Sequence, residues 1–126
     1  MTFGRGIPNI VPSTSMGANK KDHLLGRLDL LVLRVLASGK SMHGYAIAER
    51  IERLSQSVLQ LGEGSLYPAL HRMEEAGWVR SAWSASNNNR RARFYKITTL
   101  GRQKLAAEHA EWLRSADAIT RVLKLA

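Results

Sequence analysis

The chain has 126 residues, enough for one domain with extensions, and a formal net charge of +9. It has no cysteine, which excludes structural disulfides, cysteine-ligated zinc and thiol catalysis. No apolar run is long enough for a secretory signal or a membrane span, so we expect a cytoplasmic protein that makes no use of the membrane. The excess of positive charge favours a polyanionic partner.

Residues 1–21 are predicted to form a flexible N-terminal arm, because glycine, proline and small polar residues dominate and no apolar pattern recurs. From Asp22 the apolar residues recur with helical spacing, and the pattern ends at Gly39. This spacing predicts a core helix. Its apolar face comprises Leu24, Leu25, Leu28, Leu31, Val32, Val35 and Leu36.

A second helix is predicted after Ser41, a plausible cap, and it continues to about Ser55. Its buried stripe is predicted to be Ile47, Ile51 and Leu54. The charged residues of this helix have mixed signs and neighbouring positions, which indicates a solvated surface.

Residues 63–79 are predicted to contain a recognition helix. Leu66, Leu70 and Met73 recur as one buried stripe, and Gly77 ends the helical pattern. A helix that only packs against its neighbours, with an ordinary polar exterior, explains this stripe equally well.

The other face of this helix is left for a partner, and this segment by itself leaves both interpretations open. Ser65 is placed to cap the first turn, and Pro68 falls where we expect a helical amide to need no partner. The outward side chains are of kinds that contact phosphates and base edges. They are Ser65, Tyr67, His71, Arg72 and Glu75.

After Gly77 the apolar period changes from helical to two, which predicts a β-hairpin with a polar tip over residues 85–92. Each strand has one face of alternate residues: Val79, Ser81 and Trp83 on the first, and Arg93, Tyr95 and Ile97 on the second. From 76 to 107 the chain has no acidic residue. The cations in this window are Arg80, Arg90, Arg91, Arg93, Lys96, Arg102 and Lys104.

Three helices followed by a basic hairpin predict a mainly α winged helix-turn-helix domain with a small β-hairpin over residues 22–98. In such a domain the recognition helix enters the major groove of duplex DNA and the hairpin reaches the flanking backbone. The predicted DNA-binding residues lie on three elements. They are His43, Gly44 and Tyr45 on the second helix, Ser65, Tyr67, His71 and Arg72 on the third, and Arg90, Arg91 and Arg93 on the wing.

The remaining residues, 99–126, are predicted to form a dimerisation helix that opens after the cap Thr98. At about 1.5 Å per residue a helix to Leu123 is longer than one small domain needs. Its apolar positions step by four and three, which is the spacing of a seam between helices. A helix packed only on its own domain is the alternative. The seam positions are Leu105, His109, Trp112, Ala116, Ile119 and Leu123.

Four motifs together resemble the PadR family of winged-helix transcriptional regulators over about residues 24–124. The motifs occupy residues 28–33, 42–47, 64–70 and 93–98, and the Gly-Ser-Leu-Tyr-Pro-Ala-Leu run of the third is the most specific. The resemblance implies a homodimer formed by the C-terminal helix, which represses transcription from a palindromic operator. The chain is similar to the short subtype, which has a single C-terminal helix.

No catalytic constellation, cofactor motif or metal-ligand spacing is present, so we expect neither an enzyme nor a metal or cofactor.

The predicted function is a DNA-binding repressor. The resemblance to drug-sensing members further implies a small planar aromatic effector, which we place at Trp112 with His109 as a polar wall. The alternative function is a winged-helix adaptor that binds another protein and whose charge only keeps it in solution.

Overall fold

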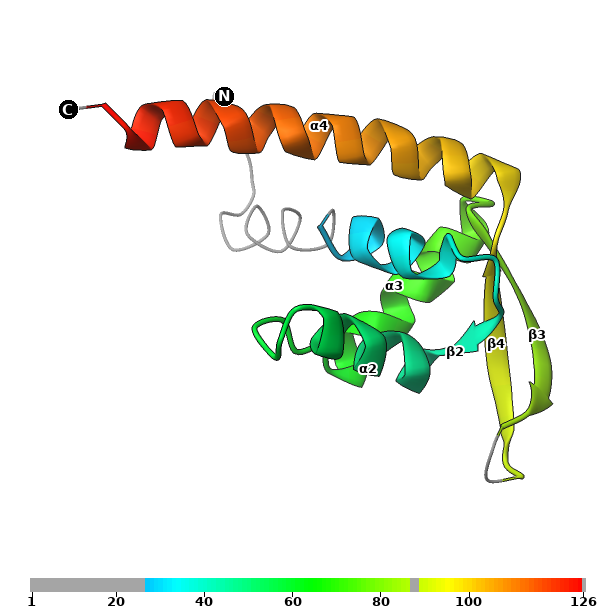
Figure 1. Ribbon diagram of the computed structural model, residues 1–126. Helices are drawn as coiled ribbons and strands as arrows, with labels where there is room; N and C mark the ends of the chain where they lie inside the picture. Colours follow the sequence, from blue (N-terminus) through cyan, green and yellow to red (C-terminus); the bar gives the residue numbers. More distant parts are fainter. Residues whose placement is uncertain (1–26, 87–88, 126) are drawn as a thin grey trace, which may run out of the picture.

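The structure is a computed structural model and describes residues 27–86 and 89–125. A first helix, whose described part is residues 27–36, is called helix 27–36 below. The other elements are β2 (Met42–His43), α2 (Gly44–Leu54), α3 (Glu63–Glu75), β3 (Val79–Ala85), β4 (Arg91–Ile97) and α4 (Thr99–Leu123). Figure 1 shows helix 27–36, α2 and α3 on one side of the sheet, with α4 crossing above them. The predicted arm lies outside the described residues.

The predicted mainly α fold with a β-hairpin is confirmed, and the hairpin is part of a three-stranded antiparallel sheet of order β2-β4-β3. In the β3–β4 ladder Ser81 is opposite Tyr95 and Trp83 is opposite Arg93, so the faces predicted from alternation are correct. Strand β2 was not predicted. Its two residues pair with the middle of β4, and two residues are too few to show a period in the sequence.

The helix caps differ in part from the prediction. Helix α2 begins at Gly44 and not after Ser41, because the chain first pairs with β4, and the Nδ1 atom of His43 accepts the capping bond from the Ala46 amide at 3.1 Å. Thr98 caps α4 as predicted, since its hydroxyl oxygen accepts from the Gly101 amide at 3.0 Å.

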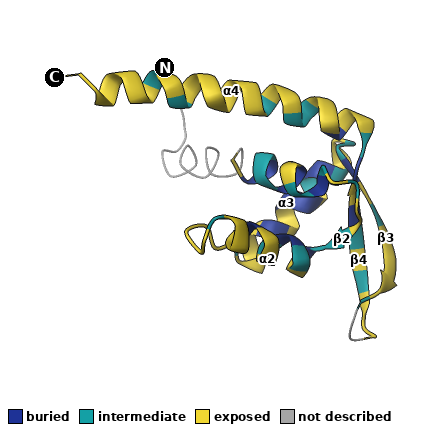
Figure 2. Cartoon of the chain, in the orientation of Figure 1, coloured by how far each residue is buried: buried dark blue, intermediate teal, exposed yellow. Residues whose placement is uncertain are grey.

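The core lies where helix 27–36, α2 and α3 meet the sheet, which Figure 2 shows as the buried region. Leu66, Leu70 and Met73 are buried as predicted. Leu54 is exposed, which corrects its assignment to the buried stripe of α2. It is the last residue of α2, and at this end the helix extends past the core.

A glycine joins α4 to the domain. A Cβ built at Gly101 would lie 2.1 Å from the Trp78 carbonyl oxygen, so only glycine allows this approach. Gly101 is also the only fully buried residue among the 25 of α4, all of which are described. Beyond its first two turns the helix therefore gains little from the described part of its own domain.

Candidate nucleic-acid interface

The start of α2 and the second turn of α3 are in direct contact. A Cβ built at Gly44 would lie 2.7 Å from Cε1 of Tyr67 and 2.9 Å from its Oη. The Tyr67 ring therefore packs against Gly44, and part of the tyrosine side chain remains exposed. Tyr45, next along α2, is also exposed, and His43 stacks on Phe94 at a centroid distance of 5.1 Å. The structure thus brings together four of the predicted contact residues.

Helix α3 starts earlier than its predicted cap. Gly62 is the N-cap and gives no side-chain capping bond, so the capping role assigned to Ser65 is wrong. Because the helix begins two residues before Ser65, Pro68 lies inside it, where the missing amide would otherwise bond the Gly64 carbonyl. Ser65 itself is exposed on the first turn, beside Gly64, whose surroundings are open.

His71 and Arg72 follow each other on α3 but have different environments. The His71 side chain is exposed, and its Nε2 lies 3.4 Å from Oε2 of Glu75 on the next turn. The Arg72 guanidinium instead donates to Oδ1 of Asp29 on helix 27–36 at 2.8 Å. The prediction that Arg72 faces the groove did not include this partner, because Asp29 lies 43 residues earlier and no local pattern connects the two.

Burial raises the pKa of the Asp29 carboxyl above its ordinary value of 3.8, while the Arg72 guanidinium acts in the opposite direction. Asp29 is only 8% exposed, so its carboxyl group is buried at the core. A cation in contact offsets part of the cost of burying such a carboxylate in its ionised form. Arg72 therefore stabilises the buried Asp29 carboxyl group, and a guanidinium held there is less available to contact base edges.

The wing arginines surround an indole that sequence reasoning did not select for the interface. The Cζ atoms of Arg91 and Arg93 lie 5.3 and 5.6 Å from the ring centroid of Trp83. Trp83 is 55% exposed, which is unusual for the largest apolar side chain. The alternation placed Trp83 on one strand face with Val79 and Ser81 and assigned it no role. Its one signal in the sequence was its place in a strand that pairs with a cationic strand.

A short polar network joins the wing to α3. Nε of Arg93 donates to the Ser81 hydroxyl oxygen at 2.8 Å, and the Ser81 hydroxyl donates to Oε2 of Glu74 at 2.7 Å. Arg93 Nη2 also lies 3.5 Å from the same carboxylate oxygen. The Arg93 charge is therefore partly neutralised by α3, whereas Arg90 and Arg91 form no ion pair within residues 27–86 and 89–125.

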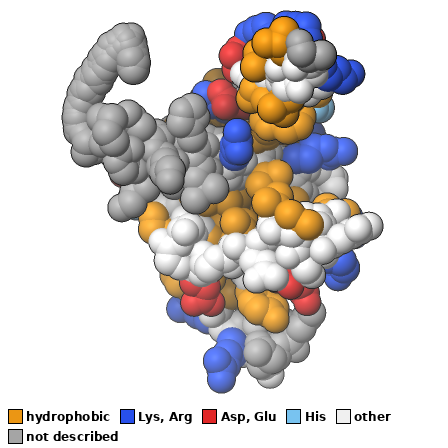
Figure 3. Space-filling model, turned by 90° about the vertical axis from the view of Figure 1, so that its left-hand side faces the viewer, with side chains coloured by type: hydrophobic (Ala, Val, Ile, Leu, Met, Phe, Trp, Pro, Cys, Tyr) orange, Lys and Arg blue, Asp and Glu red, His pale blue; other side chains and the backbone are white. Residues whose placement is uncertain are grey.

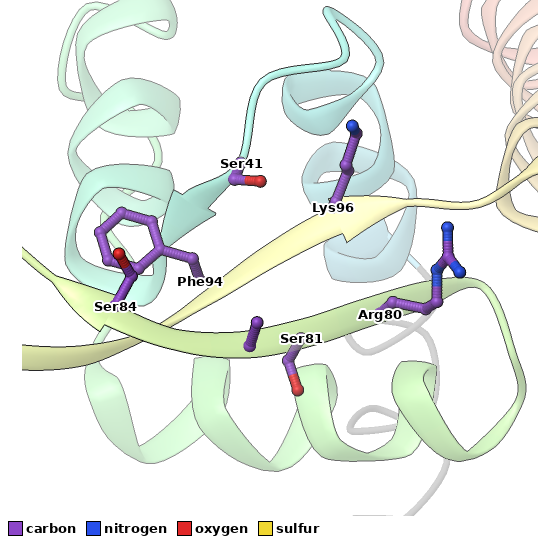
Figure 4. Close-up of a pocket in the computed structure, with 7 residues that line it drawn as sticks. Ser41, Arg80, Ser81, Ser84, Phe94 and Lys96 are labelled. Carbon is purple, nitrogen blue, oxygen red and sulfur yellow. The ribbon is translucent and has the colours of Figure 1, made fainter.

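The opposite face of the sheet has a shallow hollow of about 410 Å³. Figure 4 shows Arg80 and Ser84 from β3, Phe94 and Lys96 from β4, and Ser41 before β2 around it. Arg80 and Lys96 face each other across the two strands. They place cations on the far side of the wing from α3, so the basic window does not form one continuous surface.

Two other cations of the basic window have contacts inside the domain. Arg102 Nη1 donates to the Ala37 carbonyl at 3.1 Å, which fastens α4 to the end of helix 27–36. Lys104 Nζ lies 3.1 Å from Glu108 Oε2 and 4.8 Å from the ring centroid of Trp78. Both contacts help to hold the first turns of α4 against the domain.

The predicted seam of α4 divides into two parts. Leu105 packs against the core of its own domain, whereas Trp112 and Ile119 are 44% and 53% exposed. Leu123 is exposed as well, with Leu113 and Val122 beside the stripe, which the spacing did not select. His109 is exposed one turn before Trp112. Figure 3, viewed toward the C-terminal end of α4, shows hydrophobic side chains at this end with Lys and Arg at its edges.

Two kinds of feature, a membrane-spanning helix and a metal-binding cluster, are absent from the part of the chain that the structure describes. None of the helices in residues 27–86 and 89–125 is long and apolar enough to cross a membrane. In the same part of the chain no group of three or more His, Asp or Glu side chains is arranged to hold a metal ion.

The sequence and fold match known regulators of transcription. The model of the transcriptional regulator PadR-like family matches residues 32–107. The fold is similar to that of a transcriptional regulator from Clostridium thermocellum, with a TM-score of 0.73 and 26% identity over 82% of this chain and 99% of that one. A PadR family transcription regulator from Clostridium difficile gives a TM-score of 0.64 and 30% identity, over 76% of this chain and 97% of that one.

Two curated relatives are uncharacterized proteins. Protein X of Lysinibacillus sphaericus is 26% identical over 100 residues, which are 79% of this chain and 91% of the relative. A 37.1 kDa protein in transposon TN4556 of Streptomyces fradiae is 42% identical over 79 residues, 63% of this chain. The match spans only 21% of that protein's length, so it concerns one segment of a larger chain.

Proposed function

The chain belongs to the PadR-like family of transcriptional regulators, and from this premise we propose that it represses transcription as a homodimer on an inverted-repeat operator. Members of this family are DNA-binding regulators and not enzymes. A cytoplasmic location is part of the proposal, because the protein must reach the chromosome. The observation that carries the proposal is the contact of α3 with both the start of α2 and the basic wing.

In the proposed complex α3 lies in the major groove, with Ser65, Tyr67 and His71 near base edges. The start of α2, with His43, Gly44 and Tyr45, approaches the phosphate backbone. Arg90 and Arg91 contact phosphates beside the groove, because they are exposed and have no acidic partner in the described part of the chain. Arg72 and Arg93 support this surface through Asp29 and Glu74.

The proposed dimer uses the outer part of α4. The exposed stripe that contains Trp112, Ile119 and Leu123 has apolar area that a second copy of the same helix would remove from water. Ala116 lies between them and allows two helices to approach closely. Leu105 belongs to the base of this stripe, where the helix leaves its own core.

The DNA-binding part is tested by selecting an operator from a random duplex pool and footprinting it. A two-fold dimer places its recognition helices about one DNA turn apart, so we expect an inverted repeat with half-sites about 10 base pairs apart or a multiple of that. A footprint over a single asymmetric site would contradict the geometry. A protein-interaction adaptor, the rival function, would show only the weak salt-dependent affinity that its charge gives and would select no sequence from the pool.

The dimer is tested by sedimentation of Ile119→Asp and a matched control. Aspartate in an apolar interface costs several kcal/mol of association free energy, so this variant should be monomeric. Ala110 lies nine residues earlier, which is about 180° around the helix, and is exposed. Ala110→Asp adds the same charge on the other side and should stay dimeric. Monomers in both variants, or in neither, would contradict the assigned stripe.

We further propose that a planar aromatic effector releases the repressor from DNA by stacking on Trp112, with His109 as a polar wall. Release requires that the effector prefer a dimer whose recognition helices have the wrong separation, because equal affinity for both states shifts nothing. Indole fluorescence of wild type and Trp112→Ala, titrated with planar aromatic compounds, tests this. Quenching with unchanged affinity in the variant would assign the signal to Trp78 or Trp83 and remove the site.

A further inference from the structure

The two wing arginines that flank Trp83 differ in what holds them. Arg93 has three partners, namely the Ser81 hydroxyl, the Glu74 carboxylate and the indole. Arg91 forms no ion pair within the described residues, and the contact that places its guanidinium is the one with the Trp83 ring at 5.3 Å. Arg91 therefore keeps its full charge for a partner outside the chain.

An indole is the best of the aromatic rings for attracting a guanidinium, because its face carries the strongest negative potential. A long arginine side chain on a wing would otherwise sample many rotamers and lose that freedom on binding. Trp83 is itself anchored in the ladder opposite Arg93, seven residues of β3 pairing with seven of β4. The ladder thus fixes the backbone that carries the indole next to the Arg91 guanidinium.

We propose that Trp83 is a positioning residue for DNA binding, which holds the Arg91 guanidinium ready to contact a phosphate of the duplex. The indole acts through Arg91 and does not itself contact the DNA. This inference rests on the proposed function, because it requires that the wing lie against the phosphate backbone. The partner chemistry is a phosphodiester of double-stranded DNA, without regard to base sequence.

The test is a double-mutant cycle on a labelled random-sequence duplex, with affinity measured by fluorescence anisotropy at several salt concentrations. The variants are Trp83→Ala, Arg91→Ala and the combination. We expect Trp83→Ala to weaken binding by about two- to fivefold per protomer, which is the value of an exposed cation–π contact expressed as a ratio. In the Arg91→Ala background the same substitution should have little further effect.

Two more variants separate the ring chemistry from bulk. Trp83→Phe keeps an aromatic face and should recover part of the lost affinity, whereas Trp83→Leu keeps apolar volume alone and should behave as Trp83→Ala does. Thermal unfolding of each variant identifies any loss of affinity that follows from loss of fold. Equal recovery by leucine and phenylalanine would overturn the proposal.

The remaining outcomes are also decisive. Trp83→Ala could lower duplex affinity by the same factor in the presence and in the absence of Arg91. The indole would then contact DNA or support the wing by itself, and the positioning role would be wrong. Wild-type affinity in Trp83→Ala would overturn it too, while the proposed function would stand. Failure of the wild-type protein to bind any duplex at low salt would instead refute the proposed function, and this inference with it.

Discussion

The guanidinium of Arg72 on α3 donates to Oδ1 of Asp29 on helix 27–36 at 2.8 Å, and this pair joins the proposed recognition helix to the core. The Asp29 carboxylate is nearly enclosed, while the Arg72 side chain is about half accessible to water. Removing the cation therefore leaves a buried carboxylate without its hydrogen-bonded arginine, whereas removing the carboxylate leaves a cation that water can reach. Loss of Arg72 and loss of Asp29 should therefore lower the free energy of unfolding by different amounts.

We predict that Arg72→Ala lowers the free energy of unfolding by about 1–3 kcal/mol, and that Asp29→Asn lowers it by less. The lower part of the range for buried pairs applies because water partly screens Arg72. Urea unfolding at pH 7 measures both. If Arg72→Ala leaves stability unchanged and only weakens operator binding, Arg72 is a DNA contact, and the ion pair contributes little.

The raised pKa of Asp29 predicts a pH dependence of stability with a definite sign. The folded state holds the proton to higher pH than the unfolded state does, so the folded state is favoured at low pH. Relative to Asp29→Asn, the free energy of unfolding of the wild type should fall as pH rises from the ordinary value of 3.8 to the raised pKa, then stay constant. Urea unfolding of both proteins from acid to neutral pH measures the difference. If the free energy of unfolding rises over this window instead, the attraction of Arg72 lowers the pKa of Asp29 by more than burial raises it.

The wing should bind phosphates through the face that carries Arg91. Each phosphate neutralised releases counterions, so Arg91→Ala should weaken binding to any duplex and flatten the log K against log salt slope by about 1–2 units per dimer. Lys96→Ala is a matched control, because it removes one charge from the same strand on the other face. It should change the slope less. Equal slopes for the two variants would show that only total charge matters.

Gly44 should control the position of Tyr67. A methyl group at residue 44 would displace the Tyr67 ring, whose nearest atoms lie at the end of its side chain, so stability should fall by only about 1 kcal/mol. Operator affinity of Gly44→Ala should fall more than random-duplex affinity if the ring lies near base edges. Anisotropy titrations on both DNAs measure this.

The Tyr67→Ala background provides the control for this substitution. With no ring to displace, Gly44→Ala should have no further effect on either DNA. A loss of affinity that persists in this background would show that Gly44 itself approaches the backbone of the duplex, independently of the tyrosine.

The helices, the wing and their order were predictable because they depend on interactions between residues near in the chain. Leu66, Leu70 and Met73 share a face through the helical period alone, and the cap at Thr98 uses an amide three residues away. Gly77 adopts a positive φ of 84° at the end of α3, as its identity indicated. The apolar positions of α4 were likewise set by periodicity.

The tertiary structure decided which side chains remain free for a partner. Whether Arg72 is free depends on Asp29, 43 residues earlier, and whether Arg93 is free depends on Glu74, 19 residues earlier. Strand β2 exists because β4 offers it a partner, which moved the start of α2 to Gly44. Periodicity assigns a residue to a face, but the charge that a face presents depends on which distant residues fold against it. The fold therefore distinguished Arg91, supported by Trp83, from arginines that look equivalent in the sequence.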